Sequence, residues 1–97
     1  RRRFYLAPRP WHGVAEPLPQ LRAVQQAAWE DRQAQFAYLL AAGVRVDYLV
    51  DVFGLVARDG GWYVVYRRSG KVQVLPVRDL LEVKVALGHF ERPAGFD

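Results

Sequence analysis

The sequence predicts a mainly β domain of the α+β class, in which one N-terminal amphipathic helix precedes a small barrel of five or six strands. Two patterns predict this fold: apolar residues recur at helical spacing near residue 20, and they then alternate with a period of two almost to the C-terminus. Glycine-containing turns separate the alternating segments at short intervals. A short twisted meander buries its apolar face well by closing on itself, which favours a barrel.

The helix is expected over about residues 18–31. Apolar residues follow three- and four-residue steps there, with glutamines and charged residues between them: Leu18, Leu21, Val24 and Ala28. Pro19 suits a first helical turn, where its missing N–H is not needed. Before the helix, residues 2–6 have β character and are expected to add an edge strand.

The strands are expected to follow the helix and to be joined by tight turns. Period-two alternation or apolar runs cover residues 33–38, 44–51, 52–57, 62–66, 72–75 and 81–87. Asp59-Gly60 is a strong hairpin signal because its turn requires positive φ, and Ser69-Gly70 predicts a second turn. Pro76 ends a strand because it cannot donate to the ladder, and a single 3₁₀ turn is expected over residues 77–80.

The positive charge of the chain is concentrated at its N-terminus. The chain has 97 residues and a net charge of +4, and the arginines among residues 1–10 account for all of that excess. Residues 1–17 are therefore interpreted as a basic lead-in arm with a Pro-rich loop, and residues 18–97 as one folded domain. Because residue 1 is not Met and the chain contains none, we expect a fragment of a longer protein.

Composition argues against several classes of protein. The chain has no cysteine, which excludes disulfides and thiolate-bound metals and fits a reducing compartment. No apolar run approaches the roughly 20 residues that span a bilayer, so no membrane segment is expected. His12 and His89 have no neighbouring ligands at metal spacing, and no catalytic motif is found. We therefore expect neither a metal nor an enzyme.

Several motifs in order resemble the WYL domain. The family's Trp-Tyr-Leu run appears as Trp62-Tyr63-Val64, and its D-P-x-G-L segment as Asp51-Val52-Phe53-Gly54-Leu55. The lead-in RRRFYLAPRPW, the helix PLPQLRAVQQAAWEDR, the strand-ending Tyr38 and the closing segment from Phe90 to Phe96 are also similar to the family pattern. The resemblance covers nearly the whole chain, and the order and spacing of the motifs make it specific.

The resemblance implies a barrel of the SH3/Sm-like type that follows a winged helix-turn-helix module in bacterial transcription regulators. Such a domain is thought to sense a ligand, with nucleotides or single-stranded nucleic acid as leading candidates. The implied partners are then DNA, through a helix-turn-helix module N-terminal to this segment, and an anionic effector. A cytoplasmic location and a homodimer are expected for this regulator, with no cofactor.

Some positions depart from the family pattern. Leu39 stands where a basic residue is usual after the tyrosine. In the segment that aligns with R-x-F-R-L-D-R-I, Gln73 and Pro76 replace the first two arginines, and Arg78-Asp79 reverses the expected Asp-Arg order. Arg78 is the candidate to serve in place of the family arginine; alternatively it pairs with Asp79 or caps the short turn.

The residues that we single out for ligand binding gather around one predicted strand. They are Tyr38, Trp62, Tyr63, Tyr66, Arg67, Arg68, Gln73 and Arg78. Trp62 and Tyr63 must point to opposite faces of a strand, so at most one lies in the core. In one interpretation the outward ring is a stacking platform for a base. In the other, Trp62 only fills the core and Tyr63 is an edge residue with its hydroxyl in water.

Basic residues at the end of this strand allow two interpretations. Arg67 and Arg68, followed by Lys71, could combine with Tyr66 in a site that holds a phosphate and stacks a base. The alternative is a solvated hairpin tip that protects a strand edge.

The sequence leaves two functional hypotheses. The first is the ligand-sensing domain of a bacterial transcription regulator that binds a nucleotide-like anion. The second is a structural dimerisation or interaction module whose ligand site has been lost, motivated by the replaced arginines and by the apolar hairpin tip Leu39–Ala42. An apolar tip suggests contact with another domain or subunit, or else it folds back over the barrel mouth.

Overall fold

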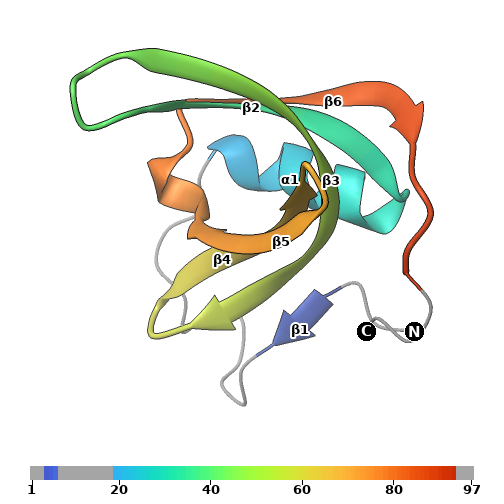
Figure 1. Ribbon diagram of the computed structural model, residues 1–97. Helices are drawn as coiled ribbons and strands as arrows, with labels where there is room; N and C mark the ends of the chain where they lie inside the picture. Colours follow the sequence, from blue (N-terminus) through green and yellow to red (C-terminus); the bar gives the residue numbers. More distant parts are fainter. Residues whose placement is uncertain (1–3, 7–18, 94–97) are drawn as a thin grey trace.

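The computed structural model describes residues 4–6 and 19–93 of the chain (Figure 1). The elements in order are β1 (Phe4–Leu6), α1 (Pro19–Trp29), β2 (Arg32–Leu39), β3 (Arg45–Arg58), β4 (Gly61–Arg68), β5 (Lys71–Pro76), the 3₁₀ turn η2 (Val77–Asp79) and β6 (Glu82–His89). The predicted class, mainly β with a single helix before the meander, is confirmed. The expectations for the basic arm beyond β1, the Pro-rich loop and Phe96 lie outside the described residues.

The strands form one sheet in the order β5-β4-β3-β2-β6. Every neighbouring pair on this path is antiparallel, and β1 adds a short parallel pairing to β3 through Phe4↔Leu55. The β3–β4 and β4–β5 connections are the two predicted turns. Their central residues have positive φ: Asp59, Gly60, Ser69 and Gly70. This geometry confirms both hairpins, because a two-residue turn of this type matches the twist of the flanking strands.

The segments 44–51 and 52–57, predicted apart, form the single 14-residue strand β3, which curves from one half of the sheet to the other (Figure 1). Its register against β4 shifts between Val52↔Tyr66 and Gly54↔Val65, so Phe53 is an extra residue in a β-bulge. A bulge bends its strand and reverses the alternation of its side chains. Val52 and Leu55 therefore both lie in the main core although they are three residues apart.

The predicted closure into a barrel is wrong. Within residues 19–93 the ladder ends at β5 on one side and at β6 on the other, and no pairing joins these two edges. The apolar face is covered instead by α1, which packs against β2, β3 and β6. The turn η2 bridges the gap between β5 and β6, and its first residue Val77 and the following Leu80 are buried in the core. Because helix and turn fill this space, the edges do not need to meet to exclude water.

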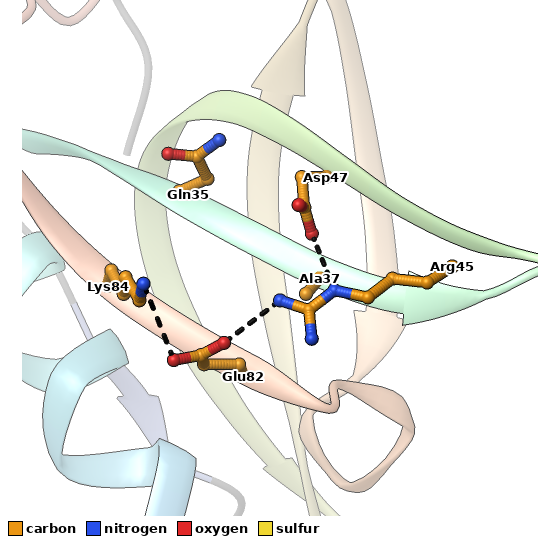
Figure 2. A pocket seen from close by; sticks show the side chains of 6 residues that line it. All are labelled: Gln35, Ala37, Arg45, Asp47, Glu82 and Lys84. Atoms are coloured by element: carbon orange, nitrogen blue, oxygen red, sulfur yellow. Dashed lines mark hydrogen bonds and ion pairs between the residues drawn. The ribbon is translucent and has the colours of Figure 1, made fainter.

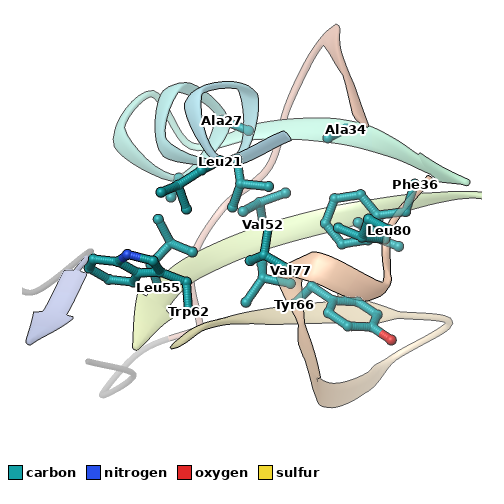
Figure 3. Close-up of a cluster of buried hydrophobic side chains, with 14 of the residues drawn as sticks. Leu21, Ala27, Ala34, Phe36, Val52, Leu55, Trp62, Tyr66, Val77 and Leu80 are labelled. Atoms are coloured by element: carbon teal, nitrogen blue, oxygen red, sulfur yellow. The ribbon is translucent and has the colours of Figure 1, made fainter. Parts of the chain in front are cut away.

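The core lies between α1 and the inner face of the curved sheet (Figure 3). The helix contributes the buried residues Leu21, Val24, Ala27 and Ala28. Three of the four residues of the predicted stripe are thus confirmed, and the fourth, Leu18, lies outside the described residues. Gln20 fixes the start of the helix, since its Nε2 donates to the carbonyl oxygen of Leu80 at 2.6 Å. Among the described residues no helix is long and apolar enough to cross a membrane.

Candidate ligand-binding site

Aromatic, cationic and amide side chains meet on the inner face of the sheet, beyond the end of the core. We call them the tyrosine–arginine cluster; its members come from β2 to β5 and are Tyr38, Tyr48, Tyr66, Arg68 and Gln73. All but Tyr48 belong to the sequence-predicted site. Strand alternation places them together, because Tyr66 and Arg68 are two residues apart on β4 and Tyr66 is directly opposite Gln73 on β5.

Short contacts connect the members of the cluster. The Cζ atom of Arg68 lies 3.8 Å from the centroid of the Tyr48 ring, so the guanidinium lies over that ring. The rings of Tyr48 and Tyr38 are tilted, with centroids 5.8 Å apart. The hydroxyl of Tyr66 donates to Oε1 of Gln73 at 3.2 Å. The edge of the cluster thus offers π-faces, a cation and an amide to a bound molecule.

Tyr66 links this cluster to the core. Its side chain is only 4% exposed and packs edge-to-face on Phe36, with ring centroids 5.3 Å apart. Figure 3 shows its hydroxyl pointing away from the other core side chains. Burial raises the pKa of this phenol, the nearby Tyr38 raises it further, and the positive charge of Arg68 opposes both effects.

Arg68 differs from its neighbour Arg67 in its electrostatic partners. Within the described part of the chain, no carboxylate forms an ion pair with Arg68, whose charge is held against the Tyr48 ring. The exposed Lys71 lies directly opposite Arg68, across the β4–β5 turn. This end of the inner face therefore has a positive potential, and an anion would be attracted there.

Arg67 lies on the opposite, outer face of the sheet. Its Nη2 is 2.6 Å from Oδ2 of Asp51, and its Nε donates to the same oxygen at 2.8 Å. The other oxygen of Asp51 accepts from Nε2 of Gln33 at 2.9 Å. A polar row therefore crosses β2, β3 and β4 and neutralises Arg67, while the guanidinium also lies 5.2 Å from the centroid of Phe53. The structure places Arg67 apart from the tyrosine–arginine cluster.

The remaining predicted residues are dispersed. Trp62 is 5% exposed and fills the end of the core away from Tyr66 (Figure 3). Tyr63 is half-buried on the outer face. Arg78 is exposed on η2, and its Nη1 lies 3.6 Å from the position that a Cβ on Gly61 would occupy. Gly61 begins β4 and Arg68 ends it, so Arg78 is a strand's length away from the cluster.

A second polar site lies on the outer face as a shallow hollow (Figure 2). Its lining comes from β2, β3 and β6 and consists of Gln35, Ala37, Arg45, Asp47, Glu82 and Lys84. Arg45 bonds to Asp47 at 3.2 Å and to Glu82 at 2.9 Å, and Glu82 is 3.7 Å from Lys84. The hydrogen bond from Arg45 lowers the pKa of Glu82. Two cations and two anions cancel, so this hollow has no net charge with which to select an ionic ligand.

Sequence reasoning missed Tyr48 as a site residue, although a signal was present. The β2–β3 hairpin pairs Tyr38 with Val46 and Phe36 with Tyr48. Once that register is assumed, Tyr48 is on the same face as Tyr38 and diagonally adjacent to it. We instead interpreted Tyr48 only as part of an alternating apolar strand.

The apolar hairpin tip between β2 and β3 is exposed. Leu39 is 53% exposed, and Leu40 and Val44 are similarly open to solvent. The tip is closed by backbone hydrogen bonds, from the N–H of Leu40 to the oxygen of Val44 and from the N–H of Gly43 to the oxygen of Leu40. Of the two alternatives for this tip, folding back over the core does not occur.

Comparisons with known proteins agree with this architecture. The solved structure of proteasome accessory factor B/C (PafBC) of Arthrobacter aurescens is similar, with a TM-score of 0.70 and 23% sequence identity. The match covers 88% of this chain and 15% of that one, so the chain spans a small part of that protein's length. No curated protein matches this chain. The family model described as WYL domain matches residues 19–85, which include α1, β2 to β5 and half of β6. The chain belongs to the WYL domain family.

Proposed function

We propose that this chain is the ligand-sensing regulatory domain of a bacterial DNA-binding transcription regulator, and that it binds a nucleotide or a nucleic-acid-like anion. The role is one of binding, without enzymatic activity, in the cytoplasm. Membership of the WYL domain family supports the regulatory context that the resemblance in the sequence implies. In the complete regulator, that module would bind DNA.

The observation that carries the ligand proposal is the position of Arg68. Its guanidinium lies over the Tyr48 ring, and among residues 19–93 it forms no ion pair. A guanidinium without an ion-pair partner can bind a phosphate without first breaking an internal salt bridge. Neighbouring tyrosine rings offer faces on which a base can stack, and each such stack contributes about 1–3 kcal/mol.

The tyrosine–arginine cluster is in contact with the core and with a neighbouring strand, so binding there can affect the rest of the domain. Tyr66 connects the cluster to the core through Phe36 and connects β4 to β5 through Gln73. A ligand that binds Arg68 more tightly in one arrangement of the regulator than in another shifts the balance toward that arrangement. The direction of regulation follows from which arrangement binds DNA.

Titration of the purified chain tests this proposal directly. Fluorescence anisotropy with labelled single-stranded oligonucleotides, and calorimetry with cyclic nucleotides, should detect binding that weakens as salt rises. A matched pair of variants localises it: Arg68→Gln should lose affinity, whereas Arg58→Gln, an exposed arginine at the other end of the same hairpin, should not. If wild type binds none of these probes at high micromolar concentration, the ligand proposal is rejected.

A second candidate function is an interaction module whose ligand site has been lost. The exposed tip formed by Leu39, Leu40 and Val44 favours it, since apolar side chains gathered at one loop often mark a contact. Under this alternative, Leu39→Asp with Leu40→Asp in the complete regulator would abolish regulation. The charge reversal Arg68→Glu would leave regulation unchanged.

A further inference from the structure

Strand β5 presents an open edge with exposed apolar side chains. Among the described elements it is paired on one side only, with β4, and it ends the sheet. Val72 is 51% exposed and Val74 is 58% exposed, and both lie on the outer face. Val74 is directly opposite Val65, so this pair extends apolar surface to the rim of the sheet, whereas Val72 is opposite Arg67.

The hairpin register shows which backbone groups of β5 are free. In a two-residue turn the flanking residues, here Arg68 and Lys71, exchange both of their hydrogen bonds, and bonded and non-bonded pairs then alternate. Gln73 and Leu75 therefore bond to β4. The N–H and C=O groups of Val72 and Val74 point away from β4, toward the open edge. The same two valines thus carry both the free backbone groups and the exposed side chains.

The opposite edge, β6, is protected in a way that β5 is not. Glu82 and Lys84 stand on its outer face, and its register against β2 is broken by an irregularity near Arg32. Arg32 also donates to the carbonyl oxygen of Ala86 at 3.4 Å. Charges and bulges are common protections against edge-to-edge pairing. In β5 the protecting residues Lys71 and Pro76 occupy only the two ends and leave the middle open.

We propose that two copies of this chain pair through their β5 strands, antiparallel about a two-fold axis at Gln73, and form one continuous sheet. In this register Val72 of each copy exchanges backbone hydrogen bonds with Val74 of the other. Lys71 falls opposite Leu75, so no like charges face each other across the junction. The short edge is self-complementary, which is why a second copy is its occupant.

The pairing also joins the two tyrosine–arginine clusters. Gln73 accepts the hydroxyl hydrogen bond of Tyr66, and in the dimer it would meet Gln73 of the second copy on the inner face. Its amide NH₂ then has an acceptor across the axis. Each site is extended by a residue of the other copy, and ligand occupancy and dimerisation become thermodynamically linked. The pairing itself does not depend on the proposed ligand.

Sedimentation of the chain without ligand is the first test. Wild type should show a monomer–dimer equilibrium that Val74→Lys weakens by about tenfold or more in Kd, because two lysines are brought into the junction. The matched control is Val44→Lys, in which a valine of similar exposure, 54%, is replaced on the β2–β3 tip. It should leave the equilibrium unchanged. A dimer that Val44→Lys disrupts and Val74→Lys does not, or a wild type that is monomeric at millimolar concentration, overturns the proposal.

Cross-linking tests the register independently. The chain has no cysteine, so a single introduced thiol is unambiguous. Facing residues of a non-hydrogen-bonded antiparallel pair have Cα atoms about 4.5 Å apart, which is within the range of a disulfide. Gln73→Cys should therefore give a covalent dimer under mild oxidation, and Val44→Cys should not. Equal cross-linking of both variants, or sedimentation of the oxidised product as larger rings or fibres, would show that the β5 pairing is not the contact.

Discussion

The guanidinium of Arg68 lies over the ring of Tyr48, with 3.8 Å between its Cζ atom and the ring centroid. The next residue back, Arg67, lies on the other face of the sheet and is held by Asp51 at 2.6 Å. Two adjacent arginines therefore have different roles because strand alternation separates them. Arg68 forms no ion pair with a carboxylate of the described residues, whereas Arg67 is neutralised by Asp51.

Arg68 should set the affinity for an anionic ligand. Replacing it in Arg68→Gln is expected to weaken oligonucleotide binding and to reduce the slope of log K against log salt by about 0.7, the value for one phosphate contact to a single strand. Anisotropy titrations at several salt concentrations measure both quantities. An unchanged slope would mean that Arg68 does not contact phosphate.

Asp51 should matter for stability and not for binding. Asp51→Ala leaves Arg67 half-buried without its carboxylate and deprives Gln33 of its acceptor. The free energy of unfolding is expected to fall by about 1–3 kcal/mol. Urea denaturation measures it, with Asp47→Ala as the control, since that exposed carboxylate should contribute about 0.5 kcal/mol or less. Equal reductions in the free energy of unfolding for the two variants would contradict the structural role of the polar row formed by Gln33, Asp51 and Arg67.

Trp62, which belongs to the family signature, should act through packing. Its ring is buried in the core, so Trp62→Ala is expected to reduce the free energy of unfolding by about 3–5 kcal/mol. The neighbouring Tyr63 is half-buried on the outer face, so Tyr63→Ala should reduce the free energy of unfolding by less. Thermal melts of both variants test the difference, and a larger loss for Tyr63→Ala would be inconsistent with the core position of Trp62.

Tyr66 should make stability decline at high pH. Its folded-state pKa is raised, chiefly by burial, above the value of about 10 that an unfolded tyrosine has. The neutral phenol is then favoured in the folded state, so its contribution is complete below pH about 10 and is lost as pH rises through the folded pKa. Denaturation of wild type and Tyr66→Phe between pH 8 and 11 should show a steeper decline for wild type. Parallel curves would rule this out.

Arg92 should connect the end of the chain to the helix. Its side chain is 3% exposed, its Nε is 2.9 Å from Oδ1 of Asp31, and its Nη2 donates to the oxygen of Ala28. Arg92→Ala removes all of these contacts and is expected to cost about 1.5–3 kcal/mol, because Asp31 and the carbonyl of Ala28 lose a charged hydrogen-bond donor. Arg32→Ala, which breaks a more exposed pair with Glu30, should cost about 1 kcal/mol or less in the same urea experiment.

The sequence predicted those elements that local chemistry decides. The helix begins and ends within two residues of the predicted bounds, because its apolar spacing and Pro19 indicate where it lies. Both hairpins form where Asp59-Gly60 and Ser69-Gly70 allow positive φ. Closure of the sheet was not predictable in this way. It depends on how much of the inner face α1 and η2 cover, and that is a matter of tertiary packing.

The candidate site could be predicted only in part. Alternation along β4 was sufficient to separate Arg67 from Tyr66 and Arg68, but we treated the two arginines as one cluster. Tyr48 required the β2–β3 register, which the turn length alone does not fix. The position of Arg78 depends on the path of η2, and no periodicity in the sequence reports that path.

Because Phe53 is an extra residue in the bulge, strand β3 contributes side chains to the main core and also a ring that packs against Phe90 outside it. The Phe53 ring is buried outside the main core, 5.4 Å from the ring of Phe90 and within reach of the guanidinium groups of Arg67 and Arg92. Deleting Phe53 would remove the bulge and leave Val52 and Leu55 both on the inner face, but it would also remove the buried ring that packs against Phe90. A library of shortened variants should therefore find that position intolerant, because the deletion removes a ring that is 1% exposed.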